Sequence, residues 1–145
     1  MLEINNLTER KINEELLREV AKKVLEGEKR KGVISLVFIG PNRMRKLNYK
    51  YKKKNRVTDV LSFSQISEKG KFIFPPGTRS ELGEIFICPR EVKKRAKRQN
   101  LDFEKELVRT FIHGLLHLLG YDHQKEKDAQ IMFEKEEKYL KTFFN

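Results

Sequence analysis

The chain has 145 residues, which is enough for one domain with a hydrophobic core and too few for two ordinary domains. No stretch of about eighteen apolar residues occurs, which excludes a membrane-spanning helix. Residues 1–6 lack the basic and apolar parts of a secretory signal, and the single cysteine, Cys88, has no partner for an internal disulfide. We therefore expect residues 1–145 to form one domain located in the cytoplasm.

The formal net charge of +11 is concentrated in one part of the chain. Residues 28–56 contain eleven basic side chains and one acidic side chain, whereas residues 124–145 contain five of each sign. A local excess of positive charge produces a directed field that favours a polyanion such as nucleic acid. Chains rich in Lys and Glu are also common as solvated or heat-adapted surfaces, so this second interpretation stays open.

In the first half of the chain, the apolar pattern predicts strands and helices in alternation. Residues 1–4 fit a short strand. Apolar residues at helical spacing follow Asn13, a plausible N-cap, and Gly27 ends that helix. The apolar run 33–39 predicts a buried strand, and a short helix from Asn42 leads to the basic segment 49–56.

In the second half, residues 58–63 and 82–88 are predicted strands. Residues 64–80 are predicted to form a flexible loop or hairpin, whose length suits a mobile flap over a groove. Helices are predicted at 90–99, 103–119 and 125–143. The helix at 103–119 is apolar over much of its surface, which indicates a central helix packed on the sheet. The predicted fold class is therefore α+β, a small mixed sheet of about four strands packed with helices.

All three histidines fall in one segment, where His113, His117 and His123 are spaced H-x-x-x-H-x-x-G-x-x-H. Residues four apart share one face of a helix, so the first two imidazoles can share a metal ion. Gly120 is placed to end the helix in a left-handed conformation and turn the chain back, which lets His123 join them. A lone histidine is usually an ordinary surface or core residue, but three at this spacing predict a metal site.

Three neutral nitrogen ligands suit one Zn²⁺ ion per chain and leave a fourth position open, which is a catalytic geometry. Such an ion could lower the pKa of a bound water to roughly 7 and polarise a phosphoryl oxygen. Metal-binding imidazoles need hydrogen-bond acceptors that orient them, and Asp122, beside His123, is the nearest candidate for such an acceptor.

The basic segment mixes tyrosines with cations, as expected where RNA bases stack and phosphates are neutralised. We expect Lys50, Tyr51, Lys53 and Lys54 to contact RNA. A solvated basic loop with the tyrosines packed beneath it is the alternative.

The run HGLLHLLGYDH, from His113 to His123, resembles the signature of the YbeY family of single-strand-specific metallo-endoribonucleases. Residues 47–51, 58–63 and 82–87 also follow the order and spacing of that family. The resemblance implies a zincin-like metal-binding helix and cleavage of single-stranded RNA in 16S rRNA maturation and ribosome quality control. It also implies rRNA precursors and ribosomal subunits as partners.

By this resemblance, Lys52 stands where the family usually carries an arginine that is important for activity. Lysine keeps the charge but loses the planar, two-pronged grip on phosphate. We expect Lys52 to stabilise the charge that develops on the scissile phosphate, with Arg56 as its substitute if Lys52 points elsewhere.

Two other functions fit parts of the pattern. Zinc peptidases share the histidine spacing, but in them a glutamate base follows the first histidine, and here that position is Gly114. Gly114 is instead expected to leave room beside the metal for a phosphate. The non-enzymatic alternative is a zinc-stabilised RNA-binding or ribosome-assembly factor. Of the remaining polar residues, Asp59 is expected to anchor an ion pair, and Glu84 is a candidate for orienting a metal ligand or acting as a base.

Overall fold

The structure is a computed structural model that describes residues 1–64, 81–122 and 124–144. In chain order its elements are β1 (Leu2–Asn6), α1 (Glu14–Gly27), β2 (Val33–Phe38), α2 (Pro41–Lys52), β3 (Val60–Ser64), β4 (Glu81–Ile87), α3 (Pro89–Arg98), α4 (Phe103–Leu118) and α5 (Glu126–Phe143).

The four strands form one mixed sheet in the order β1-β2-β4-β3. β1 and β4 both run parallel to β2, and β3 runs antiparallel to β4. The β1-α1-β2 unit needs a long crossover because parallel neighbours cannot be joined by a tight turn. The predicted α+β class with a four-stranded mixed sheet is confirmed.

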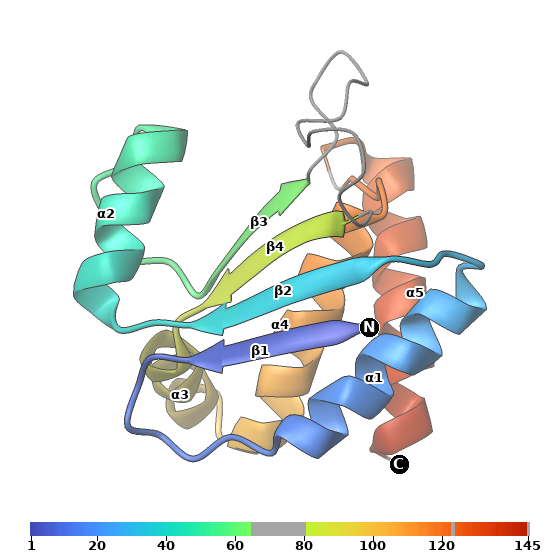
Figure 1. The fold of residues 1–145 in the computed structure, drawn as a ribbon, viewed down its shortest axis with the longest axis horizontal. Coiled ribbons are helices and arrows are strands. Elements are labelled where there is room, and N and C mark those ends of the chain that lie inside the picture. The colour runs from blue at the N-terminus through green and yellow to red at the C-terminus, as the bar shows by residue number, and fades with distance from the viewer. Residues whose placement is uncertain (65–80, 123, 145) are drawn as a thin grey trace.

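One face of the sheet holds most of the core. Figure 1 shows α1, α4 and α5 gathered on this inner face, while α2 stands apart beyond the ends of the strands. The alternating residues Ile34, Leu36 and Phe38 of β2 are fully buried, as the two-residue period of a strand requires when one face is covered. Across from them, Phe111 and Leu115 of α4 are equally buried, which makes α4 the central helix.

The opposite, outer face of the sheet carries a smaller cluster beneath α2. Its buried members are Ile39, Met44, Leu61 and Cys88. Burial raises the pKa of the Cys88 thiol, so this side chain has the character of a small packing residue, as predicted. Among residues 1–64, 81–122 and 124–144, the outer face is therefore only partly covered.

The predicted boundaries agree with the observed elements to within about two residues, except at α2. This helix starts at Pro41 and continues through Tyr49–Lys52, which the sequence pattern had assigned to a basic segment after the helix. The predicted flap at 64–80 lies outside the described residues apart from Ser64, which ends β3. Among the described residues, none of the helices is both long and apolar enough to traverse a bilayer.

Candidate metal centre

The C-terminal half of α4 presents His113 and His117 side by side. The Asp102 carboxylate accepts a hydrogen bond from the Lys105 N–H at 2.9 Å and caps the start of the helix. Three turns later the two imidazoles lie on one helical face with their Nε2 atoms 3.1 Å apart and their ring planes at 77°. Because α4 is held from several sides, the pair stands on a rigid support.

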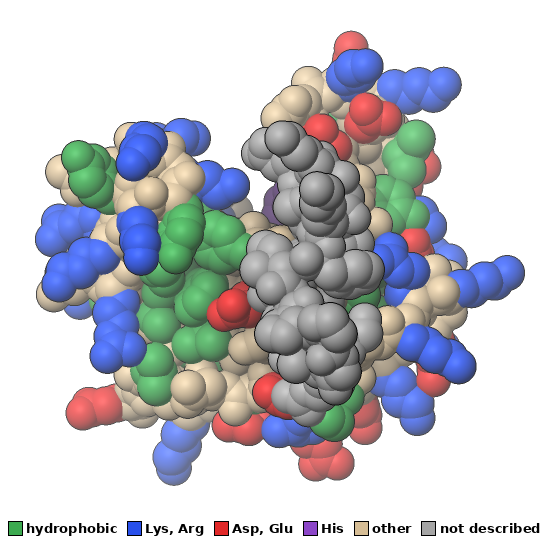
Figure 2. Space-filling view, turned by 45° about the horizontal axis from the view of Figure 1, so that its top comes forward, with side chains coloured by type: hydrophobic (Ala, Val, Ile, Leu, Met, Phe, Trp, Pro, Cys, Tyr) green, Lys and Arg blue, Asp and Glu red, His purple; other side chains and the backbone are tan. Residues whose placement is uncertain are grey.

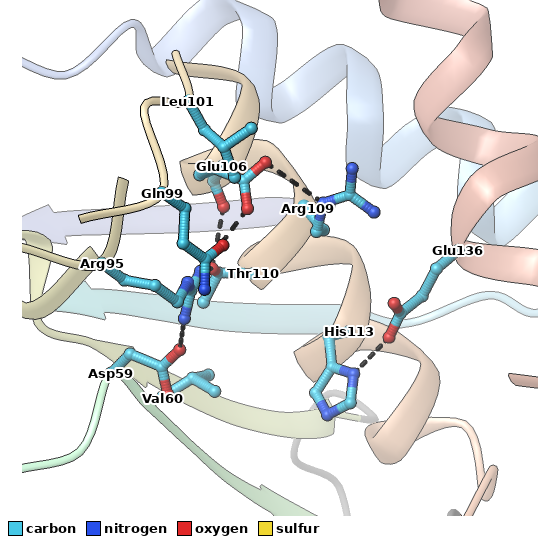
Figure 3. A pocket seen from close by; sticks show the side chains of 10 residues that line it. All are labelled: Asp59, Val60, Arg95, Gln99, Leu101, Glu106, Arg109, Thr110, His113 and Glu136. Atoms are coloured by element: carbon cyan, nitrogen blue, oxygen red, sulfur yellow. Dashed lines mark hydrogen bonds and ion pairs between the residues drawn. The ribbon is translucent and has the colours of Figure 1, made fainter. Parts of the chain in front are cut away.

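Glu136 of α5 contacts Nδ1, the second ring nitrogen of His113. The buried Glu136 carboxylate lies within hydrogen-bonding distance of Nδ1, and Figure 3 shows the two side chains pointing at each other. A carboxylate accepts hydrogen bonds, so this contact favours the tautomer with the proton on Nδ1, which leaves the Nε2 lone pair for a metal. This is the carboxylate–histidine arrangement that orients metal ligands.

Sequence reasoning missed Glu136 and selected Asp122. In the structure Asp122 is exposed, and its side chain accepts the backbone N–H of Gln124 at 2.9 Å in an Asx turn. The partner of His113 is thus an acid from another helix. The sequence did contain a signal for Glu136. Met132, Glu136 and Leu140 are four residues apart, so they lie on one face of α5, and this puts an acid among the buried residues of that helix.

The expectation for Gly114 was wrong. A Cβ atom at this position would lie 3.1 Å from Ile85 Cγ2 and 3.1 Å from Ser62 Oγ, so the missing side chain faces the sheet and its absence opens no space beside the histidines. The Ser62 hydroxyl donates to the Gly114 carbonyl at 3.2 Å. Gly114 therefore lets α4 approach β3 and β4 closely. Glu84 alternates with Ile85 and points to the outer face, away from His113.

The turn after α4 has the predicted form. Gly120 adopts a φ of +104°, the Gly120 N–H donates to the His117 carbonyl at 3.1 Å, and the Tyr121 N–H donates to the Leu116 carbonyl at 3.0 Å. This pair of bonds is a Schellman motif, which reverses the chain. His123 lies outside the described residues, so its predicted role as third ligand, and any role of Asp122 toward it, stay predictions.

Glu28, at the end of α1, anchors this turn from the other side. The Tyr121 hydroxyl, the Tyr139 hydroxyl and the Lys135 ammonium all donate to the Glu28 carboxylate, the last at 3.0 Å. Burial alone would raise the pKa of Glu28, but the three donors outweigh it, and the pKa lies below its ordinary value of 4.5. Burial and the Glu28 carboxylate together raise the pKa of Tyr139 to about 12. A single carboxylate thus joins α1, α5 and the turn.

Glu28→Gln is expected to destabilise the protein by about 2 kcal/mol at neutral pH, because hydrogen bonds to a charged group are lost. A lowered carboxylate pKa contributes stability above the unfolded-state pKa, and this stability is lost as the pH falls through the folded-state pKa. The difference in the free energy of unfolding between wild type and variant should therefore shrink below pH 4.5. Denaturant unfolding at several pH values measures it. The exposed Glu15→Gln serves as control, and a pH-independent difference would contradict the expectation.

The two described imidazoles fit a shared zinc ion. Ligands at about 2.0–2.1 Å in a tetrahedral site are separated by roughly 3.3 Å, close to the 3.1 Å between the Nε2 atoms. The same distance also suits a hydrogen bond between the rings. Across residues 1–64, 81–122 and 124–144, no group of three or more His, Cys, Asp or Glu side chains forms a complete metal site. The third ligand predicted from the sequence falls in the gap at position 123.

A polar pocket of about 520 Å³ opens beside His113. Asp59 and Arg95 form an ion pair in it, as Asp59 was predicted to do, and Arg95 also donates to the Thr110 hydroxyl at 2.8 Å (Figure 3). In the same pocket, Arg109 donates to Glu106 at 3.2 Å. The two guanidinium groups are therefore neutralised by neighbouring carboxylates, and the pocket supports α4 rather than offering charge to a phosphate.

The predicted cations lie on and after α2. Lys52 is the last residue of the helix, is exposed, and places its Nζ atom 5.9 Å from the centre of the Phe63 ring. Arg56 is exposed in the following loop. In the described part of the chain, neither forms an ion pair or hydrogen bond with His113 or His117.

The four residues expected to contact RNA are all exposed at the same end of α2. Lys50 and Tyr51 belong to the last turn, and the Lys50 Nζ lies 5.2 Å from the Tyr51 ring centre. Lys53 caps the helix in the left-handed conformation with a φ of +59°, and Lys54 follows it. This end of α2 is thus a cationic tip, and its four residues form no ion pair within the described part of the chain.

The α+β fold with paired histidines on its central helix can now be compared with known proteins. The family model described as Endoribonuclease YbeY matches residues 3–144. A protein of that name from Chlorobium luteolum is 36% identical over 145 residues, covering 99% of this chain and 98% of the relative. Another from Carboxydothermus hydrogenoformans is 36% identical over 144 residues, covering 97% of this chain and 95% of the relative.

A solved structure agrees with these matches. The solution structure of a Thermotoga maritima protein superposes with a TM-score of 0.65 at 30% identity, covering 97% of this chain and 87% of the other. The chain belongs to the YbeY family, a family of endoribonucleases. The resemblance noted in its histidine signature is therefore confirmed over nearly the whole sequence.

Proposed function

We propose that this protein is a zinc-dependent endoribonuclease that hydrolyses phosphodiester bonds in single-stranded RNA. Its substrates are precursors of 16S rRNA, its partners are ribosomal subunits, and it acts in rRNA maturation and ribosome quality control in the cytoplasm. Family membership supports RNA cleavage. The observation that carries the metal site is the facing Nε2 pair of His113 and His117, with Glu136 on the opposite nitrogen of His113.

Zinc, when bound, would supply a Lewis acid that activates water and polarises the scissile phosphate. His113 and His117 would hold it, with His123 as the third ligand. Glu136 keeps the proton of His113 on Nδ1 and fixes the orientation of the ring. Gly114 lets α4 rest closely against the sheet, which holds the helix that carries the two histidines.

The cationic tip of α2 supplies the charge that the reaction needs. Lys52, with Arg56 beside it, would offset the negative charge that grows on the phosphate in the transition state. Lys50, Tyr51, Lys53 and Lys54 would hold the RNA strand through phosphate contacts and base stacking. Their exposure and the lack of acids in residues 41–57 support this assignment.

The packing of Gly114 also argues against a peptidase. In zinc peptidases with this histidine spacing, a glutamate at that position acts as general base. Here a Cβ atom would press against Ile85 and Ser62, so a side chain at residue 114 would meet the sheet instead of the metal.

Purified wild-type protein is expected to contain about one zinc per chain and to cut single-stranded RNA but not a duplex of the same sequence. Chelation should abolish cleavage, and added zinc should restore it. Metal analysis, gel-based cleavage assays and thermal unfolding with and without chelator measure these outcomes. Unfolding on chelation, with no cleavage by the zinc-loaded protein, would instead indicate a structural clamp.

A further inference from the structure

The outer face of the sheet carries a groove that the histidine site does not use. It lies between α2 and the outer sides of β2 and β4 and has a volume of about 320 Å³. Its lining residues are Leu7, Val37, Ile39, Arg43, Lys46, Leu47, Lys50 and Phe86. Figure 2 shows hydrophobic side chains exposed on this face beside the basic side chains that cover α2 at left. We call it the α2 groove.

One wall of the α2 groove is cationic. Arg43, Lys46 and Lys50 are spaced three and four residues apart, so they line one side of the helix over about 10 Å. All three are exposed, and none forms an ion pair within the residues that the structure describes. Among the residues that the structure describes, no acid lines the groove, and residues 41–57 contain eight basic residues and no acidic one. This wall complements a polyanion.

A row of aromatic rings leads from the groove to the tip of α2. Phe86 of β4 contacts Phe63 of β3 edge-on with ring centres 5.9 Å apart, and Phe63 contacts Tyr51 at 5.1 Å. Tyr51 is 54% exposed. The Lys52 ammonium lies 5.9 Å from the Phe63 ring centre. The groove is thus continuous with the residue proposed to stabilise the transition state.

Flat apolar surface beside regularly spaced cations matches the repeating chemistry of an unpaired RNA strand, whose bases stack on rings while its phosphates pair with cations. In a duplex the base faces already stack on each other and are covered. We propose that the α2 groove binds a single-stranded segment of the RNA substrate adjacent to the cleavage site, with a base on Phe86 and phosphates on Arg43 and Lys46. This inference rests on the proposed function, and it explains part of the expected preference of the enzyme for single-stranded RNA.

The cationic wall is tested with Arg43→Gln/Lys46→Gln, and the matched control is Lys22→Gln/Lys23→Gln, which removes the same charge from the exposed surface of α1. All proteins carry His117→Ala so that the RNA stays intact. Fluorescence anisotropy with a labelled oligouridylate of about twelve nucleotides measures binding as a function of salt. The groove variant should bind roughly tenfold more weakly, and the slope of log K against log salt should be shallower by about 1.4 for two lost phosphate contacts. The control should match the parent.

The aromatic floor is tested with Phe86→Leu, which keeps apolar volume but removes the ring. Affinity for the oligouridylate should fall roughly tenfold with an unchanged salt slope, because stacking and not charge is lost. Thermal unfolding checks that the variant is folded. Binding of a duplex RNA should change little.

The inference is overturned if the α1 control loses as much RNA affinity as the groove variant. It is also overturned if both groove variants bind RNA as tightly as the parent, even if the groove is then found to bind a protein. The proposed function fails separately. If the wild-type protein cuts no RNA while the groove variants still lose single-strand binding, the groove assignment stands. If the wild-type protein cuts RNA and the groove variants bind like the parent, only the groove assignment is lost.

Discussion

Replacing His117 with alanine is expected to reduce zinc content to near zero and to lower cleavage of single-stranded RNA by at least about a hundredfold. Two imidazoles cannot hold the ion as three would, and the facing Nε2 atom that lies 3.1 Å from His113 is removed. Folding should persist, because alanine is the best helix former and His117 is only half-buried. RNA affinity should also persist, since the cationic tip is untouched. Zinc analysis, gel cleavage and anisotropy separate these effects.

Glu136→Gln provides a graded comparison. The loss of the carboxylate charge weakens the orientation of His113 without removing a ligand, so zinc affinity should fall by roughly 10–100-fold and less than in His117→Ala. Gln130→Ala, exposed on the same helix, is the control and should behave like wild type. Full zinc content and full cleavage in His117→Ala would show that the histidine pair is not the metal site.

Among the glycine-to-alanine substitutions considered, Gly83→Ala is expected to destabilise the protein the most. A Cβ atom at residue 83 would lie 2.3 Å from the Phe63 carbonyl oxygen and 2.8 Å from Leu118 Cδ2, and Gly83 has a φ of +149°. The backbone conformation and the collision with a neighbouring strand both oppose any side chain. We expect a loss of about 3 kcal/mol or more, which lowers Tm by roughly 10 °C.

The matched control is Gly40→Ala. Gly40 has an ordinary φ of −79°, and nothing lies within 4 Å of an added Cβ. Its substitution should change the free energy of unfolding by less than about 1 kcal/mol. Thermal and denaturant unfolding compare the two variants. Similar free energies of unfolding for the two variants would show that β3 and α4 do not pack against Gly83 as closely as described.

The features that the sequence predicted well depend on near neighbours along the chain. Asn13 and Asp102 cap their helices through residues three positions ahead, and the N–H groups of Gly120 and Tyr121 end α4 through bonds to residues 117 and 116. The four-residue spacing of His113 and His117 puts both rings on one face of any helix. The extension of α2 through Lys52 was missed because a lysine-rich run has no apolar stripe to mark it as helical.

By itself, then, the sequence determined the central helix, the histidine pair on it and the family to which the chain belongs. Only the tertiary structure decided which acid holds His113, which atoms Gly114 touches and how the turn after α4 is anchored. The residues involved are 23 positions apart for Glu136 and His113, 52 for Ser62 and Gly114, and 93 for Glu28 and Tyr121. Helical and strand periods govern positions within one element, whereas contacts over such separations depend on how elements pack together.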